Sequence, residues 1–194
     1  MLHIRNRIEI NKWKNIVETV IIALVAFLIF SFVLRPGRIP SSSMEPTLRI
    51  GDIVLANGLA YIASDPQRGD IVIFKHDELG KEILIKRVIG MPGDSLMFVE
   101  GDLYLNGKLL QEDYLPDGVK TDSFKDFDEI PEDCYFVMGD NRTESYDSRG
   151  WREPYVCKDD ILGKMLINIP VGRLMDYVQH QTENPVKSGL NIVK

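Results

Sequence analysis

The chain has 194 residues, 44% of them hydrophobic and 27% charged, which is enough for one globular domain and an appendage. Its formal net charge is −6, and because residues 1–14 are basic, the rest of the chain is more acidic than the whole. An acidic domain argues against a nucleic-acid partner, since such binding depends on Lys and Arg neutralising phosphates.

An apolar segment, IVETVIIALVAFLIFSFVL, occupies residues 16–34. A helix over residues 15–34 would be roughly 30 Å long, the thickness of the hydrocarbon core of a bilayer. The alternatives are a buried core helix and a cleaved signal peptide, but Leu34-Arg35-Pro36 stand where a cleavage site needs small residues. We predict a transmembrane signal anchor at residues 15–34 and a basic cytoplasmic N-terminus at residues 1–14, although charge is a weak guide to topology here.

Beyond the apolar segment the pattern is that of short strands. We predict strands at residues 53–56, 70–74, 82–89, 95–99, 103–105, 108–110, 135–138 and 164–169. Asn106-Gly107 predicts a hairpin, because both residues tolerate positive φ. The predicted fold is therefore mainly β, with a transmembrane helix followed by an all-β domain at residues 35–180. The domain includes an acidic excursion at residues 117–132 and a short helix after Pro170 through Leu174 to Val178, and residues 181–194 form a frayed tail.

The two cysteines, Cys134 and Cys157, form no CxxC pair and match neither a zinc site nor a redox motif. Two unpaired thiols are the simpler interpretation, and one structural disulfide is the alternative if the domain faces an oxidising compartment. The histidines are isolated, and His76 is interpreted as part of a solvated turn. We predict no metal site and no cofactor.

Three consecutive serines lie in IPSSSMEPTL, residues 39–48. They could belong to a polar linker or include a nucleophile, which would need a base beside it. No histidine lies near any motif, so a Ser-His-Asp triad has no base. Pro40 and Pro46 stiffen the segment and its apolar neighbours imply packing, which favours a folded segment over a linker.

Lys86 is a candidate base because it lies within the apolar segment EILIKRVIG. Strand alternation places it on one face with Leu84 and Val88. Apolar surroundings disfavour the ammonium form, and a pKa lowered from ~10.4 to about 7–8 would leave a neutral amine able to accept a serine proton. The alternative is a snorkelling lysine on an edge strand.

The third candidate segment is GDNRTESYDSRGW, residues 139–151. Ser145 could hydrogen-bond to a neutral lysine and orient it, and Asp147 with Arg149 could form a bidentate pair that stiffens the loop. The alternative is a surface loop built from Asx turns.

In order and content these segments resemble bacterial type I signal peptidases of the lysine branch, in the smaller single-anchor form. The matching motifs are a Pro-Ser-x-Ser-Met-x-Pro-Thr-Leu segment, an Arg-Gly-Asp-Ile-Val-x-Phe strand, a Lys-Arg-x-x-Gly-x-Pro-Gly-Asp segment and a Gly-Asp-Asn-Arg-x-x-Ser-x-Asp-Ser-Arg loop. They lie at residues 40–48, 68–74, 86–94 and 139–149, and the resemblance covers residues 15–170. Thr143-Glu144 replaces the Asp-Asn often found in the last motif, without a change in spacing.

The resemblance implies that Ser43 is the nucleophile and Lys86 the general base. Ser41 would bind the developing oxyanion together with the Ser43 backbone N–H, while Ser42 falls at a free position of the motif. The implied supporting residues are Ser145, Asp147 and Arg149. Residues nominated to line the substrate pocket are Ile39, Met44, Leu48, Leu84 and Ile85.

The resemblance further implies a serine endopeptidase that removes signal peptides of the Ala-x-Ala type from exported preproteins. It would sit in the cell membrane as a single-pass protein, in contact with the lipid bilayer, with an extracytoplasmic catalytic domain and no nucleic-acid partner. Two alternatives remain: a self-cleaving Ser-Lys protease of the repressor type, and a catalytically inert membrane-anchored adaptor.

Overall fold

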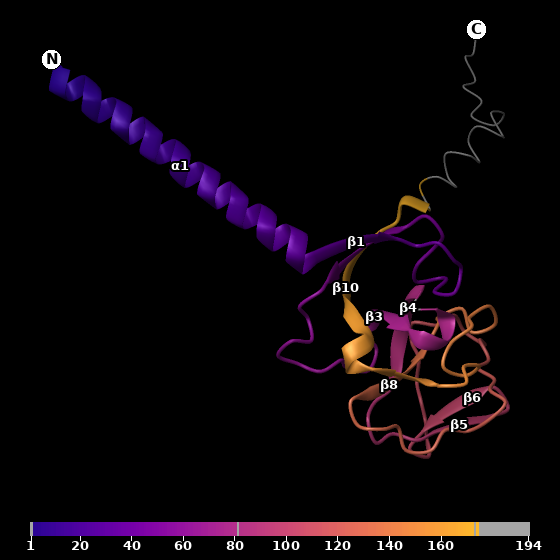
Figure 1. Ribbon diagram of the computed structural model, residues 1–194. Helices are drawn as coiled ribbons and strands as arrows, with labels where there is room; N and C mark the ends of the chain where they lie inside the picture. The colour runs from indigo at the N-terminus through magenta and orange to yellow at the C-terminus, as the bar shows by residue number, and fades with distance from the viewer. Residues whose placement is uncertain (1, 81, 173, 175–194) are drawn as a thin grey trace, which may run out of the picture.

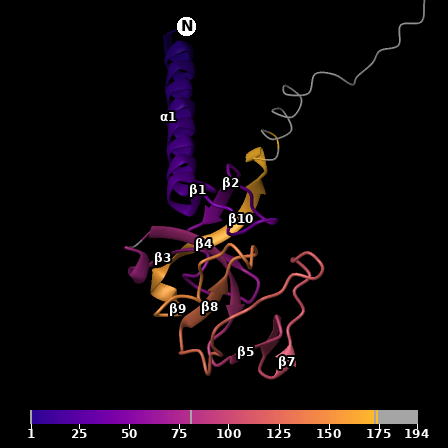
Figure 2. The same cartoon turned by 90° about the vertical axis from the view of Figure 1, so that its right-hand side faces the viewer.

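The structure is a computed structural model that describes residues 2–80, 82–172 and 174. Helix α1 (Leu2–Val33) projects away from a β-rich body, as Figures 1 and 2 show from two sides. In the described part of the chain, no helix has both the length and the apolarity that a bilayer crossing needs. The signal anchor at residues 15–34 stays a prediction.

The body consists of two antiparallel sheets. The larger is seven-stranded in the order β1-β2-β10-β3-β4-β8-β9, and the smaller is three-stranded in the order β5-β6-β7. The strands of the larger sheet are β1 (Leu34–Arg38), β2 (Ile53–Asn57), β3 (Ile71–His76), β4 (Glu82–Gly90), β8 (Cys134–Met138), β9 (Tyr155–Cys157) and β10 (Ile161–Ile169). Those of the smaller sheet are β5 (Leu96–Val99), β6 (Asp102–Leu105) and β7 (Lys108–Leu109), and short 3-10 turns are η1 (Asp77–Leu79) and η2 (Lys158–Asp160).

All the predicted strands are present, and the prediction of a mainly β body is confirmed. The predicted hairpin turn is also confirmed, with φ of 52° at Asn106 and 74° at Gly107. Strands β1 and β9 were not predicted. β1 has the sequence LRPGR, whose Pro and Gly are unusual in strands, and β9 has only three residues, too few for an alternating pattern. Both are edge strands, where these features are tolerated.

Three apolar clusters hold the body together. One lies between the small sheet and β8, one packs around Trp151 beside β3, and one lies beneath the serine segment. The acidic excursion contributes two anchors to the first cluster, because Phe127 is 4% and Ile130 is 1% exposed. The excursion is therefore fastened to the core despite its polar composition.

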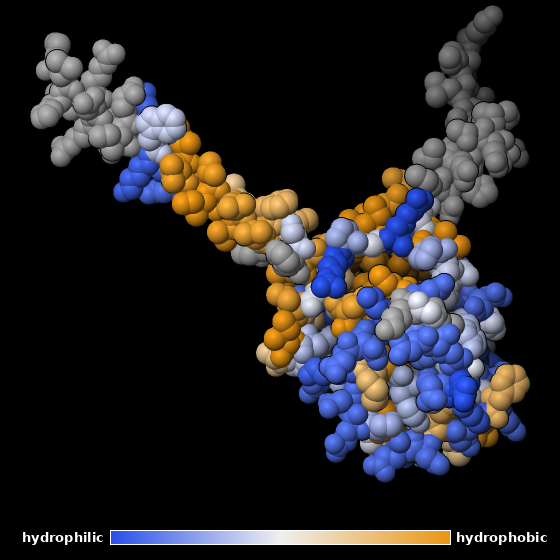
Figure 3. Space-filling view, in the orientation of Figure 1, coloured by the Kyte–Doolittle hydropathy of each residue, from blue (hydrophilic) through white to orange (hydrophobic). Residues whose placement is uncertain are grey.

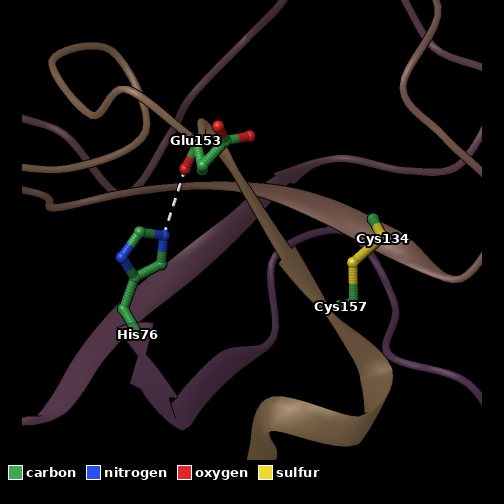
Figure 4. Close-up of a disulfide and its surroundings, with 4 residues drawn as sticks. All are labelled: His76, Cys134, Glu153 and Cys157. Carbon is green, nitrogen blue, oxygen red and sulfur yellow. Dashed lines mark hydrogen bonds between the residues drawn. A yellow bond between two sulfur atoms is a disulfide. The ribbon is translucent and has the colours of Figure 1, made fainter. Parts of the chain in front are cut away.

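Cys134 and Cys157 face each other across β8 and β9 and form a disulfide (Figure 4). The favoured prediction of two unpaired thiols was therefore wrong, because it did not include the edge pairing that places the cysteines side by side. The solvated turn predicted at His76 was wrong for a similar reason. The residue is 6% exposed, and its ring packs with its centroid 4.2 Å from that of the Trp151 ring. Its Nε2 lies 3.1 Å from the Glu153 carbonyl oxygen (Figure 4).

The chain begins a helical turn after β10, where the Leu174 N–H donates to the Pro170 carbonyl. The rest of the short helix predicted there and the tail predicted at residues 181–194 lie outside the described residues.

Candidate active site

The serine segment is folded against the core and is not a free linker. Ile39, Met44 and Leu48 are buried in the apolar cluster beneath it, together with residues of β2 and β3. Backbone hydrogen bonds from Glu45 to Ser42 and from Leu48 to Met44 form a tight turn around the third serine. Ser43 is only 9% exposed as a result.

Lys86 comes to this hydroxyl from the middle of β4. The residue pairs with Val72 of β3 and is only 4% exposed. Its Nζ lies 2.6 Å from Ser43 Oγ, within hydrogen-bonding distance, although the two residues are 43 positions apart. The fold thus brings together the two residues that the sequence singled out separately.

The environment of Lys86 favours the neutral amine. Burial lowers the pKa of Lys86 to about 8 and is the largest influence; the nearby carboxylate of Asp147 opposes it, the Arg149 guanidinium lowers the pKa further, and Asp140 raises it. The direction agrees with the expectation from the apolar strand face.

The other two serines have different surroundings. Ser41 is exposed, and its Oγ lies 3.4 Å from Ser43 Oγ, so the two hydroxyls face the same space. Ser42 is held through its backbone, because the Asn141 side-chain amide donates to its carbonyl oxygen at 3.2 Å. The Asn141 backbone N–H also donates to the Ser43 carbonyl oxygen at 3.1 Å. The loop after β8 therefore fixes the serine segment from outside.

Asp147 and Arg149 form the predicted bidentate pair. The Arg149 Nε and Nη2 donate to the two carboxylate oxygens of Asp147 at 2.8 and 2.9 Å. The same carboxylate accepts a bond from the Gly139 N–H at 2.9 Å, and Arg149 Nη2 also donates to the Arg142 carbonyl oxygen at 2.8 Å. The pair therefore ties both ends of the loop together, beside the buried lysine.

Ser145 does not make the predicted hydrogen bond to Lys86. Its Oγ is buried and has no hydrogen-bond partner among the described residues. The residue nevertheless lies at the site, because a Cβ added to Gly139 would meet both Ser145 Oγ and the Ser43 carbonyl oxygen at 2.3 Å. Gly139 is thus enclosed between the serine segment and the Ser145 side chain, and any larger side chain at position 139 would clash with them.

A second buried ion pair, which the sequence reasoning missed, lies next to Lys86. Arg87 donates to both carboxylate oxygens of Asp140 at 2.8 and 2.7 Å, and Thr47 Oγ1 donates to one of them at 2.5 Å. This connects the serine segment, β4 and the loop after β8. The sequence did place both residues beside the site, because Arg87 follows the candidate base and Asp140 follows Gly139. Their separation of 53 positions gave no indication that the two side chains meet.

The arm, defined as residues 110–122, is fastened to the same loop. Arg142, whose side chain is fully buried, donates to both carboxylate oxygens of Glu112 at 2.7 and 2.6 Å and to Thr121 Oγ1 at 2.6 Å. The Arg87 guanidinium lies 3.9 Å above the Tyr114 ring. Only residues 117–122 of the arm fell within the predicted acidic excursion, and the contacts of Glu112, Tyr114 and Thr121 were not predicted. These contacts make the arm a fixed wall near the site.

The nominated pocket residues fall into two groups. Ile39, Met44 and Leu48 are at most 3% exposed, so their side chains belong to the core beneath the serines. Leu84 and Ile85 are half-buried and keep surface that a ligand could touch. Within the described residues, no group of three or more His, Cys, Asp or Glu side chains is placed to hold a metal ion.

Comparison with known proteins connects this geometry to a family. Residues 12–169 match the family model described as signal peptidase, peptidase S26. The chain is 38% identical over 173 residues to the probable signal peptidase I-2 of Synechocystis sp., covering 84% of this chain and 77% of that protein. It is 34% identical over 178 residues to signal peptidase I P of Bacillus subtilis subsp. natto, covering 86% of this chain and 96% of that protein.

A solved structure of a signal peptidase I from Enterococcus faecalis V583 is 31% identical, with a TM-score of 0.44, and the match covers 53% of this chain and 98% of that one. The family model accounts for most of the chain, and the relatives match it over most of their own length. The chain therefore belongs to the signal peptidase family, peptidase S26.

Proposed function

We propose that this protein is a membrane-anchored serine endopeptidase that removes signal peptides from exported preproteins, with Ser43 as nucleophile and Lys86 as general base. The observation that carries the proposal is the 2.6 Å approach of Lys86 Nζ to Ser43 Oγ in a buried site where the pKa of the lysine is lowered to about 8. A serine activated by a neutral amine needs that amine within hydrogen-bonding distance and with a pKa near the working pH.

In the acylation step, Ser43 Oγ attacks the carbonyl carbon of the residue before the cleavage site and its proton passes to Lys86 Nζ. The negative charge on the carbonyl oxygen is stabilised by the Ser43 backbone N–H and the Ser41 hydroxyl, which faces the same space. The C–N bond then breaks, the Lys86 ammonium returns the proton to the leaving amine, and the signal peptide remains as an ester on Ser43.

Hydrolysis of the ester repeats the sequence with water as nucleophile. Neutral Lys86 accepts a proton from the water, which attacks the ester carbonyl, and then gives the proton back to Ser43 Oγ as the ester bond breaks. The signal peptide leaves with a free carboxylate. Asp147 and Arg149 act by holding the loop, and Ser145 packs against Gly139 in the same loop.

The binding site for the signal peptide is the open edge of β4. Strand β3 pairs with β4 from Glu82 to Arg87, whereas β8 begins to pair with β4 only at Arg87. An extended peptide can add to the edge before Lys86 through backbone hydrogen bonds. Leu84 and Ile85 offer the half-buried apolar surface there, which suits the small apolar residues of an Ala-x-Ala motif.

Helix α1 would hold the domain at the membrane. Apolar side chains cover much of its length (Figure 3), and large ones such as Ile22 and Phe27 are 68% and 66% exposed. The Cys134–Cys157 disulfide supports an extracytoplasmic position for the β body, because disulfides persist in oxidising compartments. Resistance of the full chain to alkaline extraction from membranes would test the anchor, and release into the soluble fraction would contradict it.

The decisive experiment is cleavage of a preprotein by the detergent-solubilised full chain, compared with its Ser43→Ala variant. We expect the wild type to release a shortened product whose new N-terminus follows an Ala-x-Ala motif, and the variant to release none. Equal cleavage by both proteins would contradict the proposal, as would cleavage at unrelated positions.

A further inference from the structure

Beyond Lys86, the path of a peptide bound to the open edge of β4 is blocked. β8 occupies the continuation of that edge, from the Met138 pairing with Arg87 onward. The loop after β8 then folds over the serine segment, where Asn141 hydrogen-bonds to the carbonyl oxygens of both Ser42 and Ser43. A straight peptide would therefore collide with Gly139 and Asn141, and the chain past the cleavage site has to leave the sheet.

A pocket of about 500 Å³ lies directly past this obstruction. One wall is Glu45 and Pro46, which follow the nucleophile, and another is the loop carrying Asn141 and Thr143. The arm closes the third side with residues between Pro116 and Asp122. The volume of this pocket falls within the range of ~300–1,000 Å³ that is usual for ligand sites.

The arm wall is rigid because it is fastened to the loop that forms the facing wall. The Glu112–Arg142 ion pair is at most 10% exposed at either side chain, and Thr121 adds a 2.6 Å bond to the same arginine. A pocket whose walls are joined in this way is pre-formed, so little conformational freedom is lost when a ligand enters it.

The polarity of the β4 edge and of the pocket indicates which part of the substrate each one binds. The open edge of β4 is apolar, with Ile83 64% exposed beside half-buried Leu84 and Ile85. The pocket has a mixed lining, with apolar surface from Pro46, Pro116 and Val119 and polar atoms from side chains such as Asn141 and Thr143. Apolar signal-peptide residues fit the edge, and the start of a mature exported protein, which varies in polarity, fits a pocket whose lining offers both apolar surface and polar atoms.

We propose that the pocket between the serine segment, the loop after β8 and the arm binds the first residues of the mature protein, on the far side of the scissile bond. This inference rests on the proposed function and adds a second binding site to it. Residues that fill the pocket would contribute to kcat/KM by holding the leaving segment in line with Ser43, so substrates extended past the cleavage site are favoured.

The test compares two peptide substrates with the same residues before the cleavage site, one with a single mature residue after it and one with about six. We expect the wild-type chain to prefer the longer substrate in kcat/KM by about tenfold, the equivalent of roughly 1.4 kcal/mol of contacts. Thr143→Trp and Val119→Trp each fill the pocket, from opposite walls, and should reduce this preference to near one while leaving cleavage of the short substrate within about twofold.

Glu144→Trp is the matched control, because Glu144 is exposed in the same loop but does not line the pocket. It should keep the wild-type preference. A wild-type preference near one, or a preference unchanged in both filling variants, would overturn the inference while leaving the proposed function intact. Failure of the wild type to cleave either substrate would instead contradict the proposed function.

Discussion

Replacing Lys86 with methionine should make the protein more stable and inactive at the same time. The lysine is 4% exposed, and its pKa falls from the ordinary value of 10.5 to about 8 in the folded chain. A difference of this size corresponds to roughly 3 kcal/mol that the folded state loses by carrying the ammonium in a buried position. Methionine has a similar length and needs no hydration, so it removes this cost.

The stability that Lys86→Met gains over the wild type should decrease as the pH rises. Below pH 8 both folded and unfolded chains bind the proton, and the whole cost of roughly 3 kcal/mol is present. Between pH 8 and 10.5 the unfolded chain binds more protons than the folded one, so wild-type stability rises with pH. At pH 10 the remaining cost is below roughly 1 kcal/mol, and the advantage of the variant should shrink accordingly.

The measurement is urea-induced unfolding of the wild type and Lys86→Met in the same detergent at pH 6.5 and pH 10. Lys108→Met is the control, because Lys108 is exposed on β7 and its replacement should change the unfolding free energy by less than about 0.5 kcal/mol at either pH. An equal stabilisation by Lys86→Met at both pH values would refute the reasoning, since the effect would then come from packing and not from the buried charge.

Further predictions concern activity. The kcat/KM of the wild type should rise about tenfold between pH 7 and pH 9, as the neutral fraction of Lys86 goes from roughly one-tenth to nine-tenths, while Lys86→Arg should be inactive because a guanidinium stays protonated; a substantially active arginine variant would exclude the lysine as base. Ser43→Ala should abolish cleavage and Ser42→Ala should leave most of it, and equal loss in both would show that the wrong serine was chosen. Ser41→Ala should lower kcat by about 10–1,000-fold with little change in KM, so normal turnover in that variant would remove Ser41 from the oxyanion site. Activity should persist in EDTA, and its loss with recovery on adding a metal ion would contradict a mechanism without a metal.

Local pattern was sufficient for the strands that alternate regularly and for the turns between them. The hairpin at Asn106-Gly107 follows from the backbone freedom of those two residues and needs no distant contact. The direction of the Lys86 pKa shift was also predictable, because the apolar residues next to it in the strand indicated that its amine would be buried. The motif resemblance then selected Ser43 among three serines, which no local property separates.

Contacts between segments far apart in the chain decided the rest. The 2.6 Å approach of Lys86 to Ser43 joins residues 43 positions apart, and the Arg87–Asp140 pair joins residues 53 positions apart, so neither distance follows from spacing. The cysteines pair only because two short strands meet at the edge of the sheet, and the packing of the loop after β8 leaves Ser145 Oγ buried without the predicted bond to Lys86. Sequence alone determined which residues have the chemistry for proton transfer and nucleophilic attack, through their side-chain types and immediate neighbours. Only the tertiary structure decided which of these residues are close enough to exchange a proton, because that distance depends on how β4, the serine segment and the loop after β8 pack together.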